Sequence, residues 1–119
     1  MNELSMEAAY SVDVFMQDYD LILSPTMPTP PLPIGEIYTH ELDFEAFRDH
    51  QDALINMTMV QNVTGQPAAS LPLWVSPDGL PIGMMLVGRY GDESTLFRIS
   101  GQLEQAKPWW HVLPDRSNW

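Results

Sequence analysis

The sequence predicts an α/β fold that forms only part of a larger sheet. Segments with apolar residues at helical spacing alternate with short apolar runs that are typical of strands. The 119 residues are 45% hydrophobic and 18% charged, the composition of a globular protein. About three strands and three helices are expected. Because so few strands leave both sheet edges open, we expect the chain to form the border of a bigger sheet.

The first element is an amphipathic helix followed by a short strand. The apolar stripe of the helix consists of Leu4, Ala8, Val12, Phe15 and Tyr19. Asp20 ends the helix. The run Leu21–Leu23 is typical of a strand that is buried on both faces.

Residues 24–35 form a proline-rich connector that closes at Gly35. Proline fixes φ and has no backbone donor, so this segment is expected to be extended and cannot form a central strand. Its Pro-x-x-Pro spacing also resembles ligands of SH3-type grooves. No basic residue between Met1 and Phe47 supports that docking, which favours a structural connector.

A second helix is expected to begin near Asp43, which can cap free amides with its carboxylate. Its stripe contains Phe44, Phe47, Leu54 and Ile55, and an apolar stretch continues from Met57 to Val63. Gly65 and Pro67 are expected to stop it.

The second half of the sequence predicts a hairpin and a third helix. Strands at 68–75 and 82–87 flank the turn signal Ser76-Pro77-Asp78-Gly79. Asp92 caps a helix that ends before Pro108, with an apolar face of Leu96, Ile99, Leu103 and Ala106. Three tryptophans follow, and the first part of this tail is expected to pack against the domain: Trp109, Trp110 and Trp119.

The charge excludes several classes of partner. The net charge of −11 argues against binding nucleic acid or an anionic membrane surface. No apolar run approaches the ~18 residues of a bilayer span. The first residues carry no basic segment typical of a secretory signal, so we expect a cytoplasmic protein. Residues 1–52 hold eleven acids and one base, Arg48. A solvated face explains them, and a patch that meets a basic partner is the alternative.

The residues alone give no convincing catalytic centre or metal site. Carboxylate pairs lie at expected helix starts and polar faces, where they need no catalytic role. His40, His50 and His111 lack the spacing that places two metal ligands on one helix face, and no Cys is present. Ser70 has no obvious base near it in sequence to activate it.

One region resembles a known enzyme family. The run Asn62–Pro72 continues through Asp78–Gly83, Leu86–Arg89, Gly91–Glu93 with Leu96, Gln102–Glu104 and Pro108-Trp109. This order of motifs closely resembles the C-terminal segment of amidase-signature enzymes. The earlier Asp20–Thr26 also resembles a strand of that family.

The resemblance implies part of an α/β/α sandwich in an enzyme that breaks amide C–N bonds without a metal or organic cofactor. The family uses a Ser–cis-Ser–Lys triad and an oxyanion loop, whose motifs lie upstream of the matching region and are absent here. The chain 1–119 is therefore expected to be an incomplete amidase domain without catalytic residues, inactive alone.

The resemblance also implies a turn over Thr58–Gln66 that approaches the substrate cavity, with Met57, Thr58 and Gln66 on the pocket wall and Asn62, Gly65 and Pro67 as structural turn residues. The expected partners are the remainder of the amidase chain or a second copy, and a small-molecule amide in the complete enzyme. The alternative function is a non-catalytic interaction module that binds through its sheet edge or its proline-rich segment.

Overall fold

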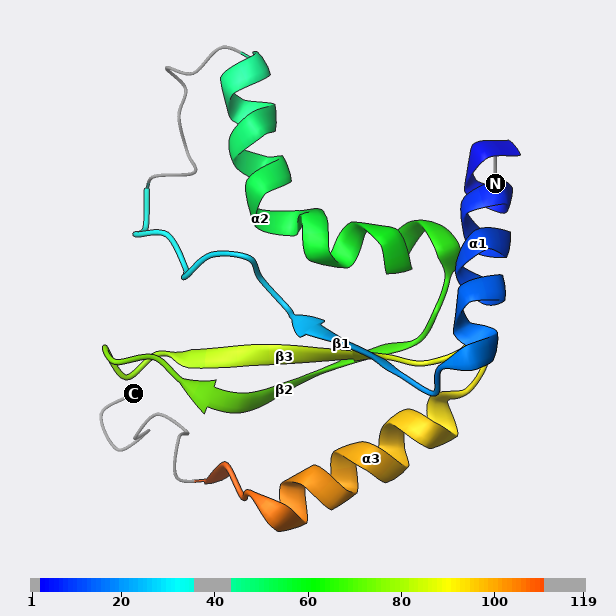
Figure 1. The fold of residues 1–119 in the computed structure, drawn as a ribbon. Coiled ribbons are helices and arrows are strands. Elements are labelled where there is room, and N and C mark those ends of the chain that lie inside the picture. The colour runs from blue at the N-terminus through cyan, green and yellow to red at the C-terminus, as the bar shows by residue number, and fades with distance from the viewer. Residues whose placement is uncertain (1–2, 36–43, 111–119) are drawn as a thin grey trace.

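The structure is a computed structural model that describes residues 3–35 and 44–110, apart from the side chains of residues 46, 50 and 53. The chain forms, in order, α1 (Glu3–Phe15), the 3-10 turn η1 (Met16–Asp18), β1 (Ile22–Pro25), α2 (Phe44–Thr64), β2 (Ala68–Val75), β3 (Pro81–Val87) and α3 (Glu93–Ala106). Figure 1 shows α2 and α3 on opposite sides of the sheet. The expected α/β fold, with three strands and three α-helices in these ranges, is confirmed.

The sheet is antiparallel with the strand order β1-β3-β2, so β3 pairs on both sides. Ile22 of β1 and Ala68 of β2 both lie opposite Val87. The predicted hairpin is confirmed, and its turn closes where Gly79 N–H donates to the Ser76 carbonyl at 2.9 Å. Gly79 has φ of +82°, a conformation that favours glycine.

Strand β1 differs from the prediction of a strand buried on both faces. It begins at Ile22 and runs to Pro25 at the edge of the sheet, and Leu23 is 60% exposed. A short apolar run is buried on both faces only when elements cover both, and the described residues leave Leu23 uncovered. The expectation that the proline-rich segment cannot form a central strand is confirmed, because the sheet contact ends where Thr26 N–H donates to the Gly83 carbonyl at 2.8 Å.

The hydrophobic core lies between the sheet and α3. Leu71, Leu86 and Leu96 are its buried centre, and it is lined by the half-buried Leu21, Leu73, Ile99, Leu103 and Trp109. The predicted apolar face of α3 is correct except for Ala106, which is exposed at the end of the helix. Trp109 packs as expected, whereas Trp110 is 62% exposed and Trp119 lies outside the described residues.

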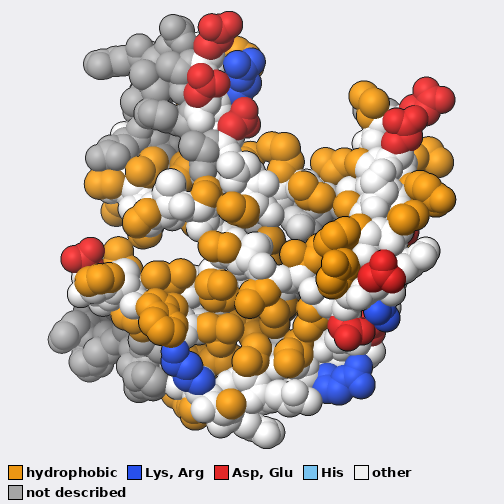
Figure 2. All heavy atoms as spheres, viewed as in Figure 1, with side chains coloured by type: hydrophobic (Ala, Val, Ile, Leu, Met, Phe, Trp, Pro, Cys, Tyr) orange, Lys and Arg blue, Asp and Glu red, His pale blue; other side chains and the backbone are white. Residues whose placement is uncertain are grey.

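Helix α1 buries a different face from the predicted stripe. Leu4, Phe15 and Tyr19 are at least half exposed, and the rings of Phe15 and Tyr19 stack 4.8 Å apart. The less exposed positions are Ser5, Ala9 and Val12, and α1 contacts α2. Small side chains allow two helices to approach closely, so the larger apolar residues stay at the surface. Figure 2 shows these hydrophobic surfaces continuing over α2 and the sheet.

Helix α2 extends further than expected. It continues to Thr64, so the expected turn over Thr58–Gln66 is wrong for its first seven residues. The predicted stop is correct, because Gly65 has φ of +82° and its N–H donates to the Gln61 carbonyl at 2.8 Å. The expected cap Asp43 lies outside the described residues.

Arg89 joins the two ends of the described fold. Its Nε donates to the carbonyls of Met16 and Tyr19 at 3.0 and 3.1 Å, and its Nη2 donates to Asp20 Oδ1 at 3.1 Å. The ion pair is solvent-exposed and contributes little by itself. The carbonyl contacts hold the chain between η1 and β1 against the connection from β3 to α3.

The N-terminus of α3 gives a test of pH dependence. Asp92 Oδ1 accepts from Thr95 N–H at 3.2 Å and from the Ser94 hydroxyl at 2.8 Å. Hydrogen bonds from Thr95 and Ser94 lower the pKa of Asp92 below its usual 3.8. A lowered pKa stabilises the fold fully above pH 3.8, and that stability is lost as pH falls through the lowered value.

We therefore expect Asp92→Ala to lower the thermal unfolding midpoint at pH 7, with a smaller difference from the wild type at about pH 2, where the carboxylate becomes protonated. Circular dichroism melts at both pH values measure it. Glu93→Ala, on the same helical turn, is the control and should change the midpoint less. An Asp92→Ala difference that stays equal at both pH values would contradict the assignment.

Candidate functional site

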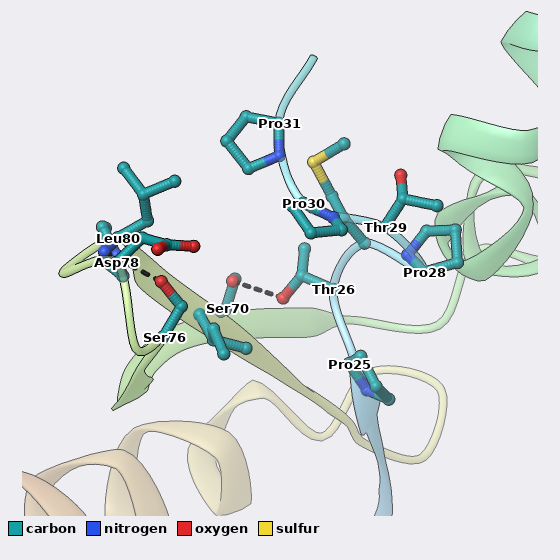
Figure 3. A pocket seen from close by; sticks show the side chains of 14 residues that line it. Pro25, Thr26, Pro28, Thr29, Pro30, Pro31, Ser70, Ser76, Asp78 and Leu80 are labelled. Carbon is teal, nitrogen blue, oxygen red and sulfur yellow. Dashed lines mark hydrogen bonds between the residues drawn. The ribbon is translucent and has the colours of Figure 1, made fainter.

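The sheet face turned away from α3 carries small and polar residues. Side chains alternate between the two faces of a strand, and Ser70 lies opposite Met85 on the neighbouring strand. Gly83 lies two positions before Met85 and therefore shares this face with Ser70. Thr26, directly after β1, reaches the same place from the other side (Figure 3).

The hydroxyl groups of Thr26 and Ser70 meet above the central strand. Their oxygen atoms lie 2.6 Å apart in a hydrogen bond that links residues 44 positions apart. A Cβ at position 83 would lie 2.8 Å from Ser70 Oγ and 2.9 Å from Thr26 Oγ1. The two hydroxyls can therefore meet only because residue 83 has no side chain.

A pocket of about 500 Å³ opens over this hydroxyl pair. One wall is the segment Pro25–Pro31 and the other is the hairpin end, with Ser76, Asp78, Leu80 and Ile82. Figure 3 shows Thr26 and Ser70 facing each other between the two walls. Ser76 Oγ accepts the Leu80 N–H at 3.1 Å, which fixes the hairpin wall.

The arrangement offers hydrogen bonds to a ligand but no activated nucleophile. Among the residues that the structure describes, no His, Lys or carboxylate bonds to Thr26 or Ser70. A serine without an adjacent base is a weak nucleophile. This agrees with the sequence-based conclusion that Ser70 lacks a base. The sequence did not single out Thr26, although the strand alternation places it on the face of Ser70.

The predicted pocket-wall residues lie elsewhere. Met57 and Thr58 are half-buried within α2, and Thr58 Oγ1 donates to the Ile55 carbonyl at 3.1 Å. Gln66 is only 5% exposed. None of the three lines the pocket over Ser70.

Gln66 belongs to a buried polar contact between α1 and the end of α2. Its side-chain oxygen accepts from the Thr64 hydroxyl, and its Nε2 donates to Asp13 Oδ1 at 3.3 Å. Thr64 is 3% exposed. Asn62, predicted as a turn residue, is an exposed residue of the last part of α2, whereas Gly65 and Pro67 lie in the connection to β2.

The described residues contain no group of three His, Asp or Glu side chains close enough to hold a metal ion. His40 and His111 lie outside these residues, as does the side chain of His50. In the same ranges, no helix is long and apolar enough to cross a membrane.

Comparison with known proteins places these observations in a family. A model of the family "Amidase" matches residues 2–97. The putative amidase AmiC of Mycobacterium leprae is 40% identical over 95 residues, which are 80% of this chain and 20% of the relative. A glutamyl-tRNA(Gln) amidotransferase polypeptide of Oceanobacillus iheyensis is 39% identical over 94 residues, 79% of this chain and 18% of the relative.

A solved structure shows the same arrangement. The 6-aminohexanoate cyclic dimer hydrolase superposes with a TM-score of 0.79 at 36% identity, over 85% of this chain and 22% of that one. The chain thus spans about a fifth of the length of the curated relatives it matches.

The close approach at Gly83 is open to a direct test. Gly83→Ala should lower the free energy of unfolding by about 1–3 kcal/mol, because the added methyl group clashes with both hydroxyls. Gly101→Ala makes the same chemical change within α3, where nothing lies within 4 Å of the new methyl group. It should stabilise the chain by about 0.5–1 kcal/mol. Urea unfolding measures both, and equal effects would refute the close approach.

Proposed function

This chain belongs to the amidase family, and we propose that it forms the C-terminal part of an amidase whose bond-breaking residues lie in the rest of the fold. The proposed reaction is the hydrolysis of a carboxamide by water to a carboxylate and an amine, without a metal or organic cofactor. One observation carries the proposal: a family match over residues 2–97 coincides with a span of about a fifth of the relatives' length.

The exposed apolar surface supports this proposal. Leu4 and Tyr10 of α1 are more than 70% exposed, and on α2 the apolar residues Ile55, Met59, Val60 and Val63 are 42–48% exposed. At about 25 cal/mol per Å² of apolar area, burying such a surface strongly favours association. The remainder of the amidase domain is the proposed occupant, since four fifths of the relatives' length lies outside the match.

The chain is proposed to be inactive alone. The triad motifs of the family lie outside its sequence, and the hydroxyl groups of Thr26 and Ser70 bond to each other instead of to a base. Met57, Thr58 and Gln66 remain the proposed wall residues of the amide pocket in the complete enzyme, and the cytoplasm remains the proposed location.

The alternative is an interaction module that binds through a sheet edge or through the proline-rich segment. Both outer strands contain a proline, Pro25 and Pro72, which removes a donor for an added strand. The proline-rich segment forms a pocket wall. These two features favour the amidase proposal.

Complementation tests the proposed function. The purified chain is mixed with the portion of the 6-aminohexanoate cyclic dimer hydrolase outside its matching region, and amine release from the cyclic dimer is followed. We expect turnover only in the mixture. Steady turnover by the chain alone would contradict the proposal, and tight binding to an unrelated partner without turnover would favour the interaction module.

A substitution on the exposed face of α1 tests the docking surface. Phe15→Asp places a charge on the exposed apolar face and should weaken association with the amidase remainder at least ~10-fold, because a buried unpaired charge is costly. Gln102→Asp introduces the same charge on an exposed position of α3 as a control. Isothermal titration calorimetry with both variants measures the difference; equal affinities would exclude α1 from the interface.

The isolated chain should self-associate. Its uncovered apolar residues are contiguous over α1, α2 and the sheet (Figure 2), and such patches drive association when their usual cover is missing. Light scattering over a concentration series measures the mass, and a well-ordered monomer at high concentration would contradict this expectation.

A further inference from the structure

The pocket over Thr26 and Ser70 has the size and the lining of a small-molecule site. Its volume of about 500 Å³ lies within the ~300–1,000 Å³ range of ligand pockets. Its walls are mainly proline, Met27, Leu80 and Ile82. The prolines have a fixed φ and no N–H, so one wall is stiff and poor in backbone donors.

The floor of the pocket supplies a hydrogen-bond donor. Thr26 and Ser70 together have two hydroxyl protons, and one of them lies in the bond between the two oxygens. The second proton remains available to an acceptor in the pocket. Gly83 keeps the floor open, because any larger residue would separate the two hydroxyls.

The charge of the lining selects among ligands. Asp78 is the one ionisable side chain among the lining residues, and no Lys or Arg is among them. With a net charge of −11 on the chain, carboxylates and phosphates are repelled from this pocket. The lining therefore suits an uncharged molecule with an apolar body and one strong acceptor, such as a carbonyl oxygen.

We propose that this pocket binds a small neutral carboxamide, with its apolar body between the proline wall and the hairpin end and its carbonyl oxygen accepting a hydrogen bond from the Thr26–Ser70 pair. The choice of a carboxamide rests on the proposed amidase function, whereas the preference for a neutral acceptor rests on the lining alone. The site is distinct from Met57, Thr58 and Gln66, none of which lines this pocket.

Titration of the ¹⁵N-labelled full chain with hexanamide tests the proposal by NMR. We expect saturable shifts of the backbone amides of Thr26, Ser70 and Gly83, with millimolar affinity. Hexanoate should not bind. Hexylammonium should bind more weakly than hexanamide, and tighter binding of this cation would assign the pocket to Asp78 and overturn the proposal.

Variants of the pair identify the donor. Ser70→Ala and Thr26→Val each remove one hydroxyl and should weaken hexanamide binding by about two- to ten-fold. Ser11→Ala removes the exposed α1 hydroxyl that donates to the Glu7 carbonyl, and it should leave the affinity unchanged. Two chemically different variants guard against misfolding of one, and the spectrum of each shows whether it is folded.

An absence of hexanamide shifts in the folded wild type would overturn the site and leave the pocket to be filled by protein in the complete enzyme. Shifts that persist equally in Ser70→Ala and Thr26→Val would overturn the role of the pair. Neither result bears on turnover in the complementation mixture, so failure of this site and failure of the proposed function are distinguishable.

Discussion

The fold depends on the pairing of one strand, β3, with two strands that precede it in the chain. Val87 lies opposite Ile22 on one side and Ala68 on the other, so β3 holds the first and second halves of the chain together. Its residues Met85, Leu86 and Val87 are all buried. Their alternation supplies the hydrophobic core on one face and the floor of the small-residue face on the other. The pocket exists because Gly83 belongs to this same strand.

The two faces of the sheet differ in completeness. Helix α3 covers one face with Leu96, which packs against Leu71 and Leu86. The other face has hydroxyl groups and glycine, and the helices near it expose large apolar side chains. A chain that folded as a complete domain would bury these side chains. The asymmetry is therefore what a border segment of a larger amidase domain should show.

Features governed by neighbouring residues were predictable from the sequence. The turn at Ser76–Gly79, the Asp92 cap and the stop at Gly65 each depend on contacts between residues close together in the chain. The exposure of Leu23 and the buried face of α1 were not predictable, because they depend on which elements lie above them. The Thr26–Ser70 pair requires knowledge of the pairing register between strands far apart in the sequence. The site was therefore less predictable than the fold.

The position of β1 has a consequence for synthesis on the ribosome. β1 bonds to β3 alone, and β3 follows it by about 65 positions at Ile22 and Val87. At ~5–20 residues per second, β1 waits about 3–13 seconds for its partner strand to be translated. During that interval Leu23 and the neighbouring apolar residues have no native partner, which makes the nascent N-terminal third a substrate for chaperones until the hairpin emerges.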